Sequence, residues 1–306
     1  MNHADNKSVQ VQGIVCSLAA GVCWGSMAVA AQALFAGGAS IGAMELVTLR
    51  LLIAGSVLIL FSGAQAFAPV RRLIDVRDVF LAGLITFGGQ FCFMKSITYS
   101  GAGVATIILT TVPFWVAFWF AVVERRMPTL RQIVCFVLAF VGVTLIVTHG
   151  DFSSLNFDVL GVSWALGSAV LSAGYSIQPR RILKTVPVTP FVGWAMVSGG
   201  LSSSLMVPPW TIHVEMSAHN LMLLFVIIII GTALAFFLYM RAIHLINPVV
   251  VGLLGSSEPL CAYVLSVLLL GTVVTGAEML GAVMVLAAVF FVTETGFRLR
   301  RRGLRR

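Results

Sequence analysis

The sequence predicts an all-α polytopic membrane protein, with ten transmembrane helices arranged as two inverted five-helix repeats. The first observation is composition, because 59% of the 306 residues are hydrophobic and only 10% are charged, far from the averages of soluble domains. The second observation is a series of ten apolar segments separated by short links. The third is a repeated spacing, since Pro113 and Pro259 lie 146 residues apart, as do Lys95 and Arg241.

The apolar segments approach the length that a bilayer requires, since a spanning helix needs about 20 apolar residues. The links between them are too short to hold a soluble domain. We therefore expect two units, residues 1–150 with five helices and residues 151–306 with five helices and a basic tail. The ten predicted helices occupy residues 13–35, 42–63, 79–96, 103–123, 133–148, 160–178, 191–207, 221–240, 249–270 and 276–293.

Basic residues mark one face of the predicted bundle. Links 36–41, 149–158, 208–220 and 271–275 contain no Lys or Arg. This positive-inside pattern places both termini in the cytoplasm, as an even number of spans also requires. The basic residues of the other face and of the termini are Lys7, Arg71, Arg72, Arg77, Arg125, Arg126, Arg131, Arg180, Arg181, Lys184, Arg298, Arg300, Arg301, Arg302, Arg305 and Arg306.

The same topology explains the net charge of +8. Because the basic residues sit in links and in the tail, we expect no nucleic-acid partner. The arginine-rich tail is interpreted as a topogenic, solvated segment, with binding to anionic lipid heads as the alternative.

The 146-residue spacing also predicts that the second repeat is inverted. Five spans in each half is an odd number, which turns the second copy over about an axis in the membrane plane. Lys95 then ends the third helix at the outer face, and Arg241 ends the eighth helix at the inner face. Transporters build a binding site between halves related in this way.

Sequence motifs argue against an enzyme, a metal site or a bound cofactor. HExxH, a P-loop, and GxSxG followed by a suitable triad are all absent. The N-terminal MNHADNKSVQ lacks the features of a signal peptide, so the first segment is expected to stay as a helix. The cysteines stand singly, without CxxC spacing, and are interpreted as buried hydrophobes: Cys16, Cys23, Cys92, Cys135 and Cys261.

Segments in both halves carry a family resemblance. GVCWGSMAVAAQ (21–32), ELVTLRLLIAG (45–55) and PFWVAFWFAVVERRMPTLRQIVCFVLAFVGVTLIV (113–147) lie in the first half. SSEPLCAYVLSVLLLG (256–271) and GAVMVLAAVF (281–290) lie in the second. Together they resemble an EamA-type permease of the drug/metabolite transporter superfamily. That pattern usually closes each half with Gly-Glu-Arg, and the second half departs from it at Gly271-Thr272, whereas the first has Val123-Glu124-Arg125.

The resemblance implies a basket in which helices one to four and six to nine surround a central cavity, with five and ten packed outside. It implies transport of small metabolites across the inner (cytoplasmic) membrane, often export of amino acids, with one branch exporting aromatic and other neutral ones. The expected partners are a small-molecule substrate and membrane lipid. The outer helices five and ten are candidates for pairing two copies as a homodimer.

Two charges stand deep in apolar sequence and are the first candidates for a substrate site. Arg50 lies about eight residues into the second helix, and Glu258 lies near the middle of the ninth. A charge at mid-membrane costs about 2.5–3.5 kcal/mol unless it is paired. We therefore expect Glu258 to bind a substrate ammonium or a proton, and Arg50 a carboxylate. The alternatives are a structural ion pair, or an Arg50 side chain that extends outward to the interface.

Two prolines are candidate gating hinges. Pro113 and Pro259 each free a carbonyl inside an otherwise helical pattern. The hydroxyls of Thr110-Thr111 and Ser256-Ser257 lie close enough in sequence to satisfy it, and the two serines are also candidate substrate contacts. A purely structural kink is the alternative.

Other polar or aromatic residues within the spans could supply walls and amide contacts to a pocket. For the Trp and Tyr residues the alternative is the aromatic belt at the membrane interface. These further candidates are Trp24, Gln90, Trp115, Tyr175 and Gln178.

The sequence is thus interpreted as a membrane transporter that exports small metabolites, neutral or aromatic amino acids first, by alternating access. Efflux of cationic or aromatic drugs is the alternative within transport, because a lone deep carboxylate suits a cation. Outside transport, the alternative is a membrane assembly or lipid-handling protein, which predicts a closed helical bundle without a central polar cavity.

Overall fold

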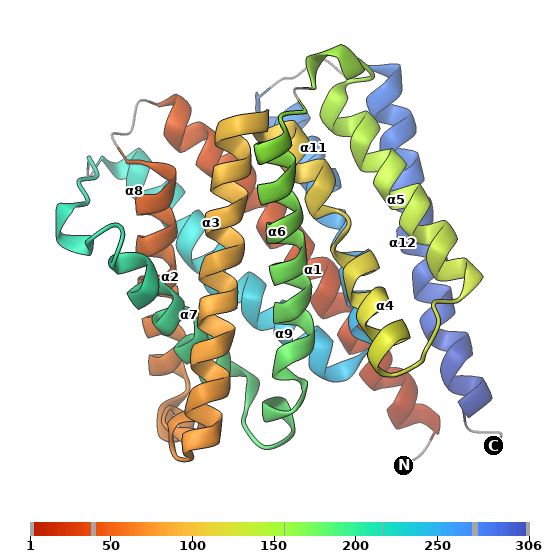
Figure 1. The fold of residues 1–306 in the computed structure, drawn as a ribbon, viewed down its shortest axis with the longest axis horizontal. Coiled ribbons are helices and arrows are strands. Elements are labelled where there is room, and N and C mark those ends of the chain that lie inside the picture. The colour runs from red at the N-terminus through yellow and green to blue at the C-terminus, as the bar shows by residue number, and fades with distance from the viewer. Residues whose placement is uncertain (1–2, 38–40, 156, 216, 271–274, 304–306) are drawn as a thin grey trace.

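A computed structural model describes residues 3–37, 41–155, 157–215, 217–270 and 275–303, and within these ranges every regular element is a helix (Figure 1). The prediction of an all-helical membrane fold is confirmed. Eight helical stretches of the described residues are long and apolar enough to cross a membrane, and Val112–Val123 is a shorter apolar helix. The total of ten spans stays a prediction.

The first half of the chain contains five main helices. Its links hold the short turns η1 (Gly63–Gln65) and η2 (Ala68–Val70), and η3 (Phe152–Ser154) follows its last helix. The helices are α1 (His3–Ala36), α2 (Ala43–Phe61), α3 (Leu73–Leu109), α4 (Val112–Val123) and α5 (Leu130–Thr148).

The second half is more divided. Its links hold η4 (Gln178–Arg180), η5 (Ile182–Lys184) and η6 (Pro209–Thr211), and a π-helix, η7 (Val226–Leu234), joins α8 to α9. The helices are α6 (Val159–Ile177), α7 (Val188–Ser204), α8 (Ala218–Phe225), α9 (Ala235–Leu245), α10 (Pro248–Leu254), α11 (Ser257–Leu270) and α12 (Gly276–Gly303).

Two predicted segments are built differently from expectation. The helix predicted at 103–123 begins after a sharp kink in α3 at Gly101 (φ 81°, ψ 164°) and is interrupted before α4. Glycine adopts such a positive φ without the steric penalty of a side chain. The segment predicted at 249–270 is divided into α10 and α11, whereas the one predicted at 221–240 is continuous from α8 to α9.

The links between α2 and α3, α4 and α5, and α6 and α7 lie at the same end of the bundle as both termini (Figure 1). We call this the basic end, because these links hold the arginines and the lysine predicted to face the cytoplasm. The side chains of Lys7 and of the tail arginines, and residues 38–40 and 271–274 of the lysine-free links, lie outside the described part of the chain. The cytoplasmic placement of this end stays a prediction.

Helix packing follows the two-fold relation that the spacing predicts. In helix order, α5 packs on α12 and α2 packs on α7, so each of these helices contacts its own counterpart. In the same order α1 corresponds to α6, and α3 corresponds to η7 and α9. The contact of α3 with α6 is therefore matched by the contact of α1 with η7 and α9, and α4 packs on α10. These main contacts between the halves therefore follow the repeat.

Glycine pairs bring the counterpart helices together. A Cβ added to Gly142 of α5 would lie 2.7 Å from the carbonyl oxygen of Gly281 on α12, and one added to Gly281 would lie 2.5 Å from that of Gly142. Gly55 of α2 and Gly193 of α7 make the same reciprocal approach, at 2.8 and 3.0 Å. Small residues at such crossings let membrane helices pack backbone to backbone.

Gly281→Ala is expected to destabilise the protein, because its Cβ would meet the backbone of α5. Overpacking of this kind costs about 1–3 kcal/mol. The midpoint of thermal unfolding in detergent, followed by size-exclusion chromatography, should fall by several degrees. Gly276→Ala in the same helix is the control, since its Cβ would meet nothing within 4 Å. Equal midpoints for the two variants would contradict the packing described.

Candidate functional site

The two interrupted helices form the centre of the candidate site. In the first half the amide of Thr110 donates to the carbonyl of Ile107 at 3.2 Å, and in the second half Ser256 donates to Leu253 at 3.2 Å. Both bonds join residues three apart at equivalent places in the repeat, although the Thr110 amide also donates to the carbonyl of Thr106 at 3.2 Å. They tighten the chain so that a new helix starts at Val112 and at Ser257.

The two predicted hinge prolines stand at these breaks. Pro113 is in the first turn of α4, and Pro259 follows the start of α11 by two residues. Gly252, shortly before the second break, lies against Pro113, where an added Cβ would be 3.3 Å from the proline Cγ. The breaks of the two halves therefore lie side by side. Whether they move stays a prediction.

The hydroxyl groups at the two breaks differ in their hydrogen bonding. Thr110 and Thr111 donate to the carbonyls of Ile107 and Ile108, each at 2.6 Å, and Thr111 also accepts from Trp115 Nε1 at 3.1 Å. The repeat equivalent of Thr111 is Ser257, whose Oγ is buried and has no partner among the described residues. The second break thus presents an unused hydroxyl where the first does not.

Arg50 and Glu258 approach one another from the two halves of the chain. Arg50 is 6% exposed and Glu258 is half-buried. They are near enough to interact electrostatically, yet they form no direct ion pair within 4.0 Å. The Nη1 of Arg50 donates to Met27 Sδ at 3.0 Å, a weak acceptor, and its Nε has no partner among the described residues.

Two glycines of α1 allow this approach. A Cβ on Gly21 would lie 3.3 Å from the amide of Glu258, and one on Gly25 would lie 2.9 Å from the Glu258 carbonyl. The backbones of α1 and α11 therefore touch beside the acid. Trp24 lies on the same stretch of α1 and contacts α9.

An aromatic group forms around Trp24, which lies between Gly21 and Gly25 on α1. The Trp24 ring lies 5.4 Å from Phe236 and 5.1 Å from Tyr239, and Tyr175 lies 5.8 Å from Phe236, all between ring centroids. The Tyr239 hydroxyl bonds Ser176 Oγ at 2.7 Å, whereas the buried Tyr175 hydroxyl has no partner in the described part of the chain. These rings form an apolar wall with one free hydroxyl.

The π-helix η7 places Thr232 and Gly231 next to Met27. Thr232 Oγ1 donates to the carbonyl of Ile227, five residues earlier, at 2.8 Å, as a π-helix allows. A Cβ on Gly231 would lie 2.2 Å from Met27 Cβ, so the glycine makes room for the methionine that Arg50 contacts. Short π segments are frequent at functional sites.

Helix α1 thus connects these candidates. Its glycines contact Ser257 and the Glu258 backbone, its Met27 contacts Arg50, and its Trp24 is linked to Tyr175 through Phe236. The other candidates lie elsewhere or are engaged. Gln90 is half-buried in the middle of α3 without a hydrogen bond among the described residues, and Ser256 is buried at the break.

Two candidates belong to other groups of side chains. Trp115 packs with Phe114 and Phe118 on α4. Gln178 lies at the basic end, where its Nε2 donates to the carbonyl of Asp78 at 2.9 Å.

Sequence reasoning missed Met27, Phe236, Tyr239 and Thr232. Met27 and Phe236 belong to residue types that are common in any membrane core, so no signal separates them from packing residues. A buried cation, a carboxylate, a free hydroxyl and an aromatic wall can together hold a small zwitterion. Among the described residues, no three His, Cys, Asp or Glu side chains gather as a metal site.

Comparison with known proteins gives one family. The EamA-like transporter family matches the chain twice, at residues 11–148 and 159–294. A solved crystal structure shares the fold with a TM-score of 0.80 at 17% identity, over 94% of this chain and 98% of the other.

Two curated relatives are named as transporters. The chain is 30% identical to "Uncharacterized inner membrane transporter YicL" of Salmonella typhimurium, over 92% of this chain and 95% of that protein. It is 27% identical to "Threonine/homoserine exporter RhtA" of the same species, over 83% of each chain.

The two breaks should respond differently to loss of a hydroxyl. Thr111→Ala removes two hydrogen bonds and should lower stability by about 0.5–1.5 kcal/mol per bond. Ser257→Ala removes a buried group without a partner, so the midpoint of thermal unfolding should stay unchanged or rise. A clear fall in stability for Ser257→Ala would mean that its hydroxyl is already bonded.

Proposed function

Because this chain belongs to the EamA-like transporter family and is a multi-pass transporter of the inner membrane, we propose that it exports amino acids with neutral or aromatic side chains. The observation that carries the proposal is the arrangement of Arg50 and Glu258. They are opposite charges from the two halves of the chain that interact without a direct ion pair.

A zwitterion satisfies these charges better than they satisfy each other. A buried, incompletely paired ion is costly. The only side-chain acceptor that Arg50 contacts among the described residues is the thioether of Met27, and its Nε has no partner there. An amino-acid carboxylate bound by Arg50 accepts charge-assisted hydrogen bonds. Its ammonium group can then bind Glu258 and Ser257.

The aromatic wall supports a neutral or aromatic side chain on the substrate. Trp24, from the stretch of α1 whose glycines contact the Glu258 backbone, packs with Phe236 and Tyr239, and such ring faces suit an apolar or aromatic group. The relative named as a threonine/homoserine exporter also favours amino acids as the substrate class.

Alternating access is the proposed mechanism. Inverted repeats, here residues 1–150 and 151–306, can exchange two conformations by rocking of one half against the other. The adjoining breaks at Pro113 and Pro259 are proposed as the hinges, because a shortened turn has fewer helical hydrogen bonds to lose on bending. Coupling to protons through Glu258 is part of this proposal.

Efflux of cationic or aromatic drugs is the second candidate. It is favoured by the presence of a carboxylate, Glu258, and of the rings of Trp24 and Tyr239. These groups could bind an aromatic cation without Arg50. Membership of a transporter family favours both candidates over a lipid-handling or assembly protein. Pairing of two copies through α5 and α12 stays a prediction.

Glu258→Gln should lower amino-acid export about tenfold or more, because the loss of one charge-assisted bond is worth about 1.5–3 kcal/mol. Export of labelled threonine and phenylalanine from proteoliposomes measures this directly. Glu45→Gln is the control, since Glu45 only caps α2 by accepting from Gly42 N at 2.7 Å. Normal flux at every pH in the Glu258 variant would contradict both substrate binding and proton coupling by this residue.

Arg50→Gln separates the two candidate functions. If Arg50 binds the substrate carboxylate, amino-acid export should fall about tenfold or more while efflux of an aromatic cation such as ethidium is unchanged or increased. Both fluxes are measured in the same vesicles, with size-exclusion profiles to verify folding. Unimpaired amino-acid export by this variant would contradict binding of the substrate carboxylate by Arg50, whereas ethidium efflux without amino-acid export by the unsubstituted protein would favour the drug-efflux candidate.

A further inference from the structure

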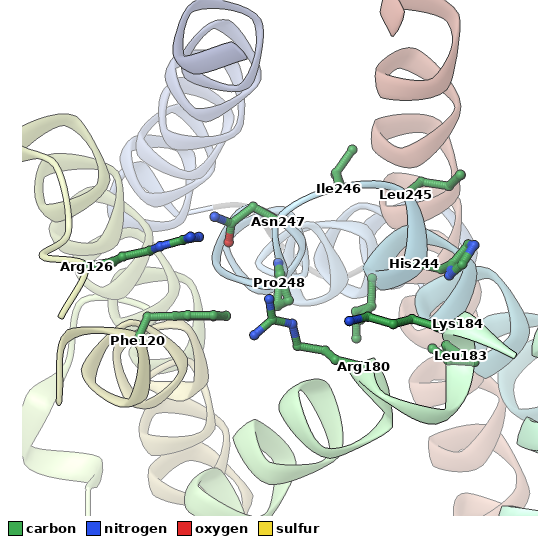
Figure 2. Close-up of a pocket in the computed structure, with 11 residues that line it drawn as sticks. Phe120, Arg126, Arg180, Leu183, Lys184, His244, Leu245, Ile246, Asn247 and Pro248 are labelled. Carbon is green, nitrogen blue, oxygen red and sulfur yellow. The ribbon is translucent and has the colours of Figure 1, made fainter. Parts of the chain in front are cut away.

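A separate pocket opens at the basic end of the bundle, away from Arg50 and Glu258. Its volume is about 390 Å³, and its lining comes from the end of α4, the link after α6 and the junction of α9 with α10. We call it the basic pocket. Figure 2 shows the side chains of Phe120, Arg126, Arg180 and Lys184 directed toward one centre, next to Asn247 and Pro248.

The polar groups of this pocket are mostly hydrogen-bond donors. Arg126, Arg180 and Lys184 contribute three cations. The Asn247 side-chain oxygen is used, because it accepts from Val249 N at 2.8 Å, and its amide nitrogen has no acceptor among the described residues. Lys184 likewise has no ion-pair partner in the part of the chain that the structure describes.

One acid, Glu124, partly neutralises the cations. Its Oε1 lies 2.6 Å from Arg180 Nη1, and its Oε2 lies 3.6 Å from Arg126 Nη1. The guanidinium carbon of Arg180 also lies 4.8 Å from the centre of the Phe120 ring, a cation–π contact. Three cations against one carboxylate leave a net positive charge.

The backbone after α4 helps to hold this arrangement. Arg125 adopts the left-handed region (φ 53°), which non-glycine residues rarely occupy. The amide of Arg126 then donates to the carbonyl of Phe120 at 3.0 Å. This turn places Arg126 and Glu124 on the same side as the Phe120 ring.

We propose that the basic pocket binds a phosphate or carboxylate group. Its volume is within the range of small-molecule sites, and its surplus positive charge and unused donors suit an anion with several oxygens. Such a group can come from a dissolved anion or from the head of an anionic phospholipid.

The bound anion would compete with Glu124 for Arg180 and Arg126. The Glu124–Arg180 pair ties the link after α6 to the end of α4, next to a second tie between Arg181 Nη2 and Asp78 Oδ2 at 2.9 Å. Occupancy of the pocket would therefore weaken one of the two ion pairs that, among the described residues, connect the halves at this end.

The test uses the purified full-length protein in phosphatidylcholine nanodiscs, titrated calorimetrically with inorganic phosphate and with succinate. Lys184→Gln and Arg126→Gln should each weaken binding about fivefold, as expected for one cation near a membrane surface. Glu124→Gln should strengthen binding severalfold, because it removes the internal competitor. Arg131→Gln is the control, an exposed arginine of the same end outside the pocket.

The source of the anion is separated by a second arm, in which nanodiscs contain phosphatidylglycerol and retained lipid is counted by native mass spectrometry. Binding of phosphate or succinate that is weaker in Lys184→Gln and Arg126→Gln and stronger in Glu124→Gln identifies a dissolved anion. The same differences in retained phosphatidylglycerol, without binding of free anions, identify a lipid head. Failure of both arms, or weaker binding by Glu124→Gln, would overturn the proposal without bearing on export through Arg50 and Glu258.

Discussion

A helix that breaks inside a bilayer leaves backbone groups without partners, and each such group costs several kcal/mol in hydrocarbon. A break is therefore tolerated only where protein or a water-filled cavity surrounds it. In this chain both breaks are placed against each other, with Gly252 packed on Pro113. The glycine crossings of α5 with α12 and of α2 with α7 hold the surrounding helices in the two-fold arrangement that buries them.

The two halves share this geometry but differ in their chemistry. The first break uses the hydroxyls of Thr110 and Thr111 for its own carbonyls, whereas the second leaves Ser257 free beside Glu258. Arg50 comes from the first half and its opposite charge from the second. The proposed site therefore needs groups from both halves. A change in the angle between the halves would alter that contact, as alternating access demands.

Much of this could be predicted from the sequence, because charges and prolines in lipid-depth segments stand out from their surroundings. Arg50, Glu258 and the two prolines beside the breaks stand out in this way, whereas the breaks themselves lie in segments predicted as continuous helices. Met27 and Phe236 could not be, since residues of these types fill any membrane core, and the π-helix has no signal in its run of isoleucines. The end of α3 was misplaced because Gly101 kinks the helix rather than ending it. The basic pocket combines side chains from three distant links, which only the folded chain brings together.

Counterflow in proteoliposomes with phenylalanine and its two charge-deleted analogues, phenethylamine and 3-phenylpropionate, tests the central claim most directly. All three carry the same ring, so they differ only in the groups proposed to meet Glu258 and Arg50. We expect exchange of phenylalanine alone, because each analogue leaves one buried charge unpaired. Exchange of phenethylamine as fast as phenylalanine would contradict a zwitterion site and would identify Glu258 as a binding site for cations.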